Sequence, residues 1–414
     1  MRIIVHSIFY RPDLTGVAKY TGEMCEWLAA RGHEVAVIAP PPHYPQWSVS
    51  PPYRAWRYFS EVLDGVRVWR SPLWVPKQPS GLRRILYSLS FLLFSAPLAL
   101  RAALRPADVI VTVQPSLLSA ISAWITARVT GAAAWLHVQD YEVDLAFSLG
   151  QLRRGRRLAW ALESWLMRRF DVISSITPRM LETASSKGVK EERLFLLPNW
   201  FDPETIRPVA PEATLRAELG LAPSETVVLF AGSLGAKQGL EVLLDAARIS
   251  PSAIFLICGD GVMADHLRSR ASGLANVKFL PLQPADRLNA LLNTADIHAL
   301  PQDPSAANAV MPSKLIGMLA TERPIVAAAA PGTEIAGLVE GCGIRVNPAD
   351  SKAFSHAILT LAANSAARRQ LGEAARARAL SMFRSDVILP SFESQLRRLA
   401  KGELPKKVSR FVAE

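Results

Sequence analysis

Apolar and polar residues are arranged in two kinds of pattern along this chain. Short apolar runs rich in Val, Ile, Leu and Ala predict buried strands. Between them lie longer stretches with apolar residues at helical spacing, such as Met24, Trp27 and Leu28, and these predict amphipathic helices. Strands that alternate with helices are typical of parallel sheets covered by helices on both faces.

The alternation falls into two series. In the first, strands are predicted at 2–10, 34–40, 66–72, 107–113, 132–138, 171–177 and 193–199, and helices at 17–33, 116–131 and 158–170. In the second, strands are predicted at 226–235, 253–261, 277–283, 296–301, 323–330 and 343–348, and helices at 239–249, 263–271, 286–295 and 313–322. A Pro-rich segment at 200–213 without apolar periodicity indicates a linker, and a last helix is predicted at 385–402.

The two series predict an α/β protein with two Rossmann-like domains whose parallel sheets face a central cleft. A chain of 414 residues is long enough for two cores. We expect an N-terminal domain at 1–200, a C-terminal domain at 201–384, and a final segment, 385–414, that packs back on the N-terminal domain. Because ligands of such sheets bind at the carboxyl ends of the strands, we expect the chemistry there.

The amino-acid composition limits which kinds of molecule this protein is expected to bind. Half of the residues are hydrophobic and 20% are charged, which excludes a disordered chain. The net charge of +11 favours an anionic partner, namely a nucleotide, a nucleic acid or an acidic lipid surface. The basic residues are scattered and match no recognition motif, so we expect no nucleic acid. Three widely spaced cysteines predict neither a disulfide framework nor a zinc site and favour the reducing cytoplasm, and no signal peptide is expected from the opening residues.

The segment 83–105 stands apart because it has no charge from Ile85 to Leu100 and arginines at both ends. It is shorter than the roughly 20 apolar residues of a spanning helix, and Pro97 interrupts it. Three interpretations stay open: a membrane span, a helix lying in the membrane interface, and an ordinary buried helix.

Three turns of the second series carry candidate anion-binding groups. A glycine-bearing loop follows the strand that ends at Gly232, and Lys237 is placed to face a phosphate. Asp260 lies in a strand-to-helix turn, where a structural role is favoured over a ligand contact. In "AVMPSKLIGMLA", Ser313 is a candidate N-cap, and free amides with Lys314 would form a diphosphate site. A solvated lysine is the alternative at both Lys237 and Lys314.

Two turns of the first series are candidates as well. Gly16, in "RPDLTGVAKY", would let backbone approach a ligand, although a plain loop fits equally and no GxGxxG or P-loop pattern is present. His137 and Asp140 end a predicted central strand, where side chains are placed to touch substrate. A structural histidine is the alternative, and the spacing matches no metal-ligand set.

Several stretches resemble one enzyme family along nearly the whole chain. They are "TGVAKYTGEMCEWLAARGHEVAVIAP", "LLPNWFDPETIRP", "FAGSLGAKQGLEVLLDAA", "ICGDG", "ADIHALP" and "MPSKLIGMLATERPIVA". These resemble segments of the retaining nucleotide-sugar glycosyltransferases of family 4, which have the two-domain GT-B architecture. The version here is most similar to enzymes of exopolysaccharide or colanic-acid assembly.

The resemblance implies a metal-independent hexosyl- or deoxyhexosyltransferase that needs no cofactor beyond a UDP- or GDP-linked co-substrate. The implied acceptor is a lipid-linked saccharide, so the enzyme is expected on the inner face of the plasma membrane, with the basic segment 83–105 at the lipid surface. From their place at the end of a central strand, His137 and Asp140 are the expected catalytic residues, although the resemblance implies no protein nucleophile. The implied donor-binding residues are Gly16, Gly232, Ser233, Lys237, Gln238, Gly259, Asp260, Leu280, Ala309, Val310, Met311, Pro312, Ser313 and Lys314.

The chain departs from the family at four positions. Two glutamates usual in the family are replaced by Ala309 and Gly317, and a usual arginine and lysine by Ser233 and Gln238. Lys237, Lys314 and backbone amides are the expected substitutes. Two other functions therefore stay open: a nucleotide-sugar-binding homologue without transferase activity, and a nucleotide-sugar epimerase.

Overall fold

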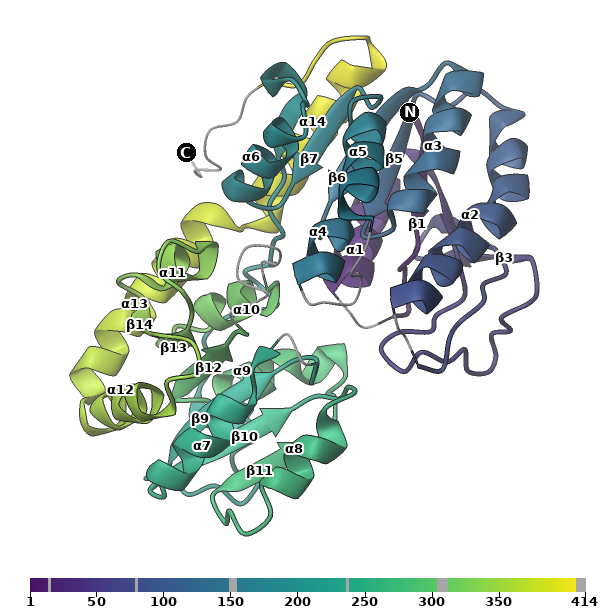
Figure 1. The fold of residues 1–414 in the computed structure, drawn as a ribbon. Helices are drawn as coiled ribbons and strands as arrows, with labels where there is room; N and C mark the ends of the chain where they lie inside the picture. The colour runs from purple at the N-terminus through teal and green to yellow at the C-terminus, as the bar shows by residue number, and fades with distance from the viewer. Residues whose placement is uncertain (14–15, 79–80, 149–154, 236–237, 304–311, 407–414) are drawn as a thin grey trace. The chain divides into compact units, whose positions relative to one another are not determined.

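The computed structural model describes residues 1–13, 16–78, 81–148, 155–235, 238–303 and 312–406 (Figure 1). The chain divides into two compact units. Unit 1 holds Met1–Pro198 together with the described residues from Val387 onward, and unit 2 holds Asn199–Asp386. Each unit is built on one β-sheet.

The sheet of unit 1 has eight strands in the order β3-β4-β2-β1-β5-β6-β7-β8. Their bounds are β1 Arg2–Ser7, β2 Glu34–Ala39, β3 Phe59–Leu63, β4 Val66–Arg70, β5 Val109–Gln114, β6 Ala133–Val138, β7 Val172–Ser175 and β8 Leu194–Leu196. All neighbours pair in parallel except β3 and β4. These two form a hairpin around Asp64 and Gly65, whose φ angles are 48° and 80°. Sequence analysis missed β3, although Asp-Gly is the usual pair in such a turn.

Seven helices of the described residues belong to unit 1. They are α1 Gly16–Ala30, α2 Gly81–Ala103, α3 Leu117–Thr130, α4 Glu142–Ser148, α5 Arg156–Met167, α6 Pro178–Ser186 and α14 Ser385–Ala400. Helix α14 comes from the far end of the chain and covers the sheet. Its Phe392 ring meets the Trp135 ring of β6 edge-on at 5.1 Å, and Glu393 accepts a bond from Arg31 Nε at 2.8 Å.

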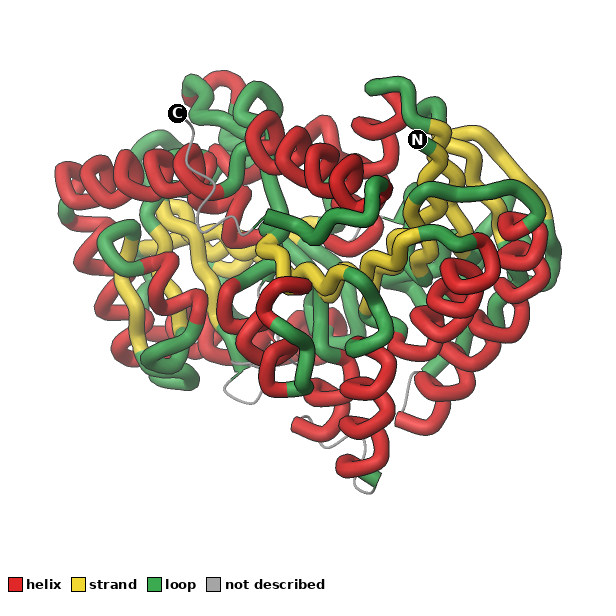
Figure 2. Tube along the Cα trace, turned by 90° about the horizontal axis from the view of Figure 1, so that it is seen from above, coloured by secondary structure: helices red, strands yellow, loops and turns green. Residues whose placement is uncertain are grey.

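The sheet of unit 2 has six parallel strands in the order β11-β10-β9-β12-β13-β14. The strands are β9 Thr226–Ala231, β10 Ala253–Cys258, β11 Val277–Leu280, β12 Ile297–Pro301, β13 Ile325–Ala328 and β14 Gly343–Val346. The helices are α7 Glu241–Ile249, α8 Ala264–Arg270, α9 Leu288–Asn293, α10 Lys314–Ala320, α11 Glu334–Val339, α12 Ser351–Ala363 and α13 Ser365–Met382. Figure 2 shows strands with helices on either side.

Side chains of the central strands β9, β10, β12 and β13 enter two separate apolar clusters. Leu229 and Leu256 belong to one cluster, and Val228 and Phe255 to the other. Because neighbouring residues of a strand point to opposite faces, both faces of the sheet are buried, and its strands read as continuous apolar runs. The predicted α/β fold with two parallel-sheet domains is therefore confirmed.

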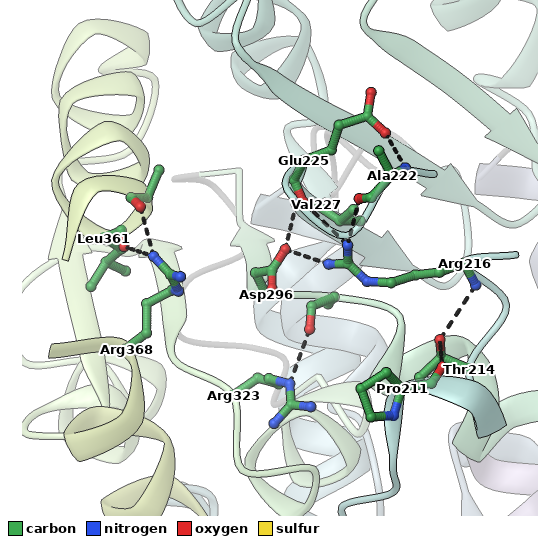
Figure 3. A network of polar contacts seen from close by, with 12 residues as sticks. Pro211, Thr214, Arg216, Ala222, Glu225, Val227, Asp296, Arg323, Leu361 and Arg368 are labelled. Carbon is green, nitrogen blue, oxygen red and sulfur yellow. Dashed lines mark hydrogen bonds and ion pairs between the residues drawn. The ribbon is translucent and has the colours of Figure 1, made fainter. Parts of the chain in front are cut away.

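A polar network holds the amino edge of this sheet (Figure 3). Asp296, just before β12, accepts hydrogen bonds from the Arg216 guanidinium and from the N–H of Val227 in β9, the latter at 2.7 Å. Arg323 Nε donates to the Ala295 carbonyl at 3.0 Å. These bonds fix the amino ends of β9 and β12, so the loops at the opposite edge start from a rigid base.

Candidate functional site

The backbone segments at the carboxyl ends of β9, β10 and β11 lie very close to one another. The N–H of Gly232 donates to the Cys258 carbonyl at 2.9 Å, and that of Gly259 donates to the Leu280 carbonyl at 3.1 Å. Gly259 has a φ of 149°, and a Cβ there would lie 1.8 Å from the Gly232 oxygen. Only glycine fits this approach. The structure thus brings together three predicted site residues, Gly232, Gly259 and Leu280.

Lys314 places a positive charge at this edge. Its Nζ lies 2.6 Å from Gln238 Oε1 and 3.8 Å from the centroid of the Phe230 ring, a cation–π contact. A Cβ on Gly232 would lie 3.4 Å from the same nitrogen. The predicted residues Lys314, Gln238 and Gly232 therefore form one cluster, in which a half-buried ammonium lies beside bare backbone. Such a group attracts an anion that enters the edge.

The start of α10 differs from the prediction. Ser313 has helical angles, φ −56° and ψ −26°, and its hydroxyl makes no capping bond. Ser313 occupies the predicted N-cap position of α10, but its hydroxyl caps no amide, because a capping side chain needs extended backbone to reach the amides that follow. Instead, Leu315 N–H donates to the Pro312 carbonyl at 3.0 Å and Ile316 N–H to the Ser313 carbonyl at 3.3 Å. Two amides of the expected diphosphate site are therefore already bonded.

The other predicted donor-side residues fall into two groups. Asp260 stabilises its own turn, since its carbonyl accepts from Leu234 N–H and its Oδ1 from Gly261 N–H, both at 2.8 Å. This agrees with the structural role favoured from the sequence. Ser233 is half-buried in the loop after β9. Lys237, Ala309, Val310 and Met311 lie outside the described residues and stay predictions.

In unit 1, His137 is a buried residue of β6. Its Nδ1 lies 2.9 Å from Ser174 Oγ and its Nε2 2.9 Å from Gln139 Nε2, so both ring nitrogens are engaged. Burial lowers the pKa of His137 to about 3, which keeps the ring neutral. This geometry favours the structural alternative, and the catalytic role stays a prediction. Gly16 is the first residue of α1, at the carboxyl end of β1.

Asp140 is half-buried in the turn after β6, two residues before Glu142. Burial raises the pKa of Glu142 to about 7; Arg84 opposes this rise and the Asp140 charge adds to it. A carboxyl group that titrates near neutral pH at a strand end is a candidate acid or base. The prediction pointed to the right turn, and Glu142 is the group whose titration is shifted there.

Sequence reasoning missed Asp13, three residues before Gly16. Its Oδ1 accepts from the backbone N–H groups of His43 and Tyr44 at 2.9 and 3.1 Å, and burial raises its pKa to about 7. The His43 ring continues the network with its Nε2 2.6 Å from the Tyr87 hydroxyl. No local pattern reveals this contact, because the partners lie 30 residues or more apart.

Among the described residues, no group of three or more His, Cys, Asp or Glu side chains is placed to hold a metal ion. The groups that the structure does gather at the edge of the second sheet are glycine backbone, an amide and a lysine. This set suits a ligand with phosphate oxygens.

Comparison with known families matches both halves of the chain. Residues 15–200 match the model of the glycosyl transferase 4-like domain, and residues 225–364 match that of glycosyl transferases group 1. The colanic acid biosynthesis glycosyl transferase WcaI of Escherichia coli K12 is 42% identical over 370 residues, which are 86% of this chain and 90% of that protein.

Solved structures share the fold at lower identity. Sucrose-phosphate synthase from Thermosynechococcus elongatus is 19% identical with a TM-score of 0.77, over 97% of this chain and 100% of that one. Anabaena HepE in complex with UDP-glucose is 17% identical with a TM-score of 0.72, again over 97% and 100%.

Proposed function

The chain belongs to the family 4 glycosyltransferases with the GT-B fold, and from that premise we propose a specific reaction for it. It transfers a hexosyl or deoxyhexosyl group from a UDP- or GDP-linked donor to a lipid-linked saccharide. The transfer retains the anomeric configuration and serves the assembly of an exopolysaccharide or another cell-surface polysaccharide. The 42% identity to WcaI supports the pathway class.

The cluster around Lys314 is the observation that carries the proposal. When the sugar leaves, negative charge grows on the diphosphate, and a cation already in place stabilises that charge without reorganising. The Lys314 ammonium lies beside Gly232, where no side chain of the loop stands between the ammonium and the backbone. Gln238 holds the ammonium there through its Oε1. The family usually has a lysine at position 238. Here Gln238 instead holds the Lys314 ammonium near that position.

The remaining steps follow from the bonds that change. The bond from the anomeric carbon to the diphosphate oxygen breaks, and the acceptor hydroxyl oxygen bonds to that carbon on the same face. A phosphate oxygen of the leaving group takes the hydroxyl proton, so no protein base is required. Because Lys314 supplies positive charge at the leaving group, we propose that no metal ion is required, and EDTA is expected to leave the initial rate unchanged.

The donor and acceptor classes have separate support. HepE, which shares the fold, has been solved with UDP-glucose, and this favours a nucleotide sugar as the donor. The net charge of +11 and the apolar, arginine-flanked helix α2 favour an acceptor held at a lipid surface. We accordingly propose a cytoplasmic enzyme, peripheral on the inner face of the plasma membrane.

A screen of nucleotide sugars by thermal shift tests the donor, because a ligand of the folded state raises its Tm. The best ligand is then titrated against the Lys314→Met variant and against Lys352→Met, which removes an exposed lysine of α12. A charge-assisted hydrogen bond contributes about 1.5–3 kcal/mol, so Lys314→Met should weaken binding about 10- to 150-fold. Lys352→Met should bind like the wild type, and equal affinities of the two variants would refute the role of Lys314.

Product analysis separates the alternatives. The wild type should release nucleoside diphosphate and glycosylate a lipid-linked saccharide only when both substrates are present. Binding without any turnover would identify the non-catalytic homologue that the Ala309 and Gly317 replacements leave open. Conversion of the donor to its epimer without an acceptor would identify an epimerase.

A further inference from the structure

The outer side of α2 in unit 1 carries apolar side chains that face water. Leu82, Leu93 and Leu100 are 67%, 61% and 67% exposed. Together with Leu86 and Leu89, which are also exposed, they recur at helical spacing and form one stripe. Leaving such large side chains in water is unfavourable, so a continuous stripe of them indicates a surface with a partner.

The inner side of α2 is built into the core. Phe91 stacks on the His6 ring of β1 with the centroids 5.0 Å apart, and His6 Nε2 lies 3.1 Å from Ser95 Oγ. Ser90 Oγ accepts the Trp74 N–H at 3.2 Å. By length and composition α2 is able to cross a membrane. Because these contacts occupy one of its sides, only the other side is available, and this suits lying along a surface.

Two neighbouring helices extend the apolar surface. Figure 1 shows α5, α3 and α2 side by side over the sheet of unit 1, and α3 packs against both others. Ile125 and Val129 are exposed on α3, and Leu158 on α5 is 77% exposed. The Trp124 ring of α3 meets the Trp165 ring of α5 at 5.8 Å. The exposed sides of α2, α3 and α5 are called the docking face from here on.

The charge of the docking face has one sign. Within the bounds of α2, α3 and α5, the only acidic residue is Glu163, which is buried against Lys187. The basic residues of the same helices are Arg83, Arg84, Arg101, Arg128, Arg156 and Arg157. The docking face thus combines exposed leucines with arginines and has no exposed carboxylate within these helices. Such a face complements a surface whose outer layer is anionic and whose interior is apolar.

We propose that the docking face binds the interface of an anionic phospholipid bilayer, with α2 lying in the plane of the membrane. The leucines of the stripe would enter the acyl boundary, while the arginines remain among the phosphates. Aromatic residues flank the face in the manner of interfacial anchors: Trp56, next to Phe94 of α2, and Trp165 of α5. The inference deepens the peripheral location proposed above and rests on it.

Sedimentation of the full chain with lipid vesicles tests the docking face. Vesicles of phosphatidylcholine alone are compared with vesicles that contain 30 mol% phosphatidylglycerol. The wild type should bind the anionic vesicles and release from them in about 0.5 M salt, where screening is short-ranged. The variant Arg83→Gln/Arg128→Gln/Arg157→Gln should bind about 100-fold more weakly at low salt, at about fivefold for each arginine.

The apolar part is tested by Leu82→Gln/Leu93→Gln/Leu100→Gln, which should weaken vesicle binding at least about tenfold. Matched controls in unit 2 change three exposed apolar residues, Ile249→Gln/Leu359→Gln/Met382→Gln, and three exposed cations, Arg207→Gln/Lys352→Gln/Arg369→Gln. Both controls should bind vesicles like the wild type. Thermal shift with the donor confirms that every variant is folded.

Each outcome has a defined meaning. The proposal would be overturned if the wild type bound neutral and anionic vesicles equally. It would also be overturned if the unit 2 controls lost as much vesicle binding as the variants of the docking face. A wild type that forms dimers which the leucine variant dissociates, with no binding to vesicles, would overturn it as well. Donor binding reports separately on the transferase, so its failure beside intact vesicle binding would refute the proposed function and leave the docking face standing.

Discussion

The carboxylate of Glu393 joins the last helix to the rest of unit 1, and its replacement by glutamine gives a measurable prediction. The side chain is 6% exposed and bonds three partners: His33 Nε2 at 3.0 Å, Arg31 Nε at 2.8 Å and Arg397 Nη2 at 2.6 Å. Burial alone would raise the pKa of Glu393. The hydrogen bonds from His33 and Arg397 and the charges of Arg31 and Arg397 outweigh burial and lower it to about 2.

The lowered pKa sets the size of the effect. A pKa of about 2 against an ordinary 4.5 corresponds to about 3.4 kcal/mol of folding free energy, at about 1.36 kcal/mol for each pKa unit. The side chains of Arg31 and Arg397 are 55% and 54% exposed, so solvent screens part of this, and about 2 kcal/mol is a reasonable expectation. Because the folded pKa is lowered, this stabilisation is present above pH 4.5 and is lost as the pH falls towards 2.

Thermal unfolding of Glu393→Gln measures the effect. At pH 7 the Tm of unit 1 should fall by about 4–8 °C, at about 2–4 °C for each kcal/mol in a unit of this size. The gap from the wild type should narrow at pH 4 and again at pH 3.5. Glu182→Gln, an exposed change on α6, controls for loss of a negative charge and should leave the Tm in place. An unchanged Tm for Glu393→Gln at pH 7, or a gap that stays constant down to pH 3.5, would refute the reasoning.

Three further changes have defined outcomes. Burial raises the pKa of Asp13 to about 7, so the folded protein loses stability as the pH rises from 3.8 through 7. The variant Asp13→Asn should therefore show a smaller decline of Tm between pH 5 and 8 than the wild type. An unchanged slope would contradict this. The pKa of His137 is about 3, so its ring stays neutral between pH 5 and 9. The pH–rate profile of folded His137→Gln should therefore have the same shape as that of the wild type in this range. If the variant lost an inflection that the wild type shows, His137 would be catalytic after all. Gly259→Ala would place a Cβ 1.8 Å from the Gly232 oxygen and should destabilise unit 2 by at least about 3 kcal/mol in urea unfolding, whereas Gly273→Ala, also at positive φ but in open space, should cost only about 1 kcal/mol.

The fold was predictable from the sequence because its strands are buried on both faces. Continuous apolar runs such as "TVVLFA" and "AIFLIC" are typical of strands buried on both faces, and their alternation with helical patterns indicates a sheet covered by helices. Two of the elements that escaped prediction have weak periods. Helix α13 is rich in Ala and Arg and buries only a narrow side of small residues. Strand β3 lies at the sheet edge, where its residues alternate between half-buried and exposed.

The candidate site was predictable where local chemistry determines it. Gly232 and Gly259 carry backbone angles that their turns require, and sequence shows this directly. The contact of Lys314 with Gln238 joins residues 76 positions apart, and that between Asp13 and His43 spans 30. Such pairs depend on the order of strands in the sheet, which a single sequence does not specify. Ser313 stands at the N-cap position without making a capping bond, because residue type favours such a bond but the backbone angle decides whether it forms.

The return of α14 to unit 1 has a consequence for synthesis on the ribosome. Unit 2 is complete once Asp386 has emerged, whereas unit 1 still waits for the residues that follow Val387. Until then the Trp135 ring lacks its contact with Phe392, although more than half of the chain has already been translated after it. The part of the enzyme that is made first is therefore finished last, and a nascent chain must keep an open aromatic surface from sticking to its neighbours until its final helix arrives.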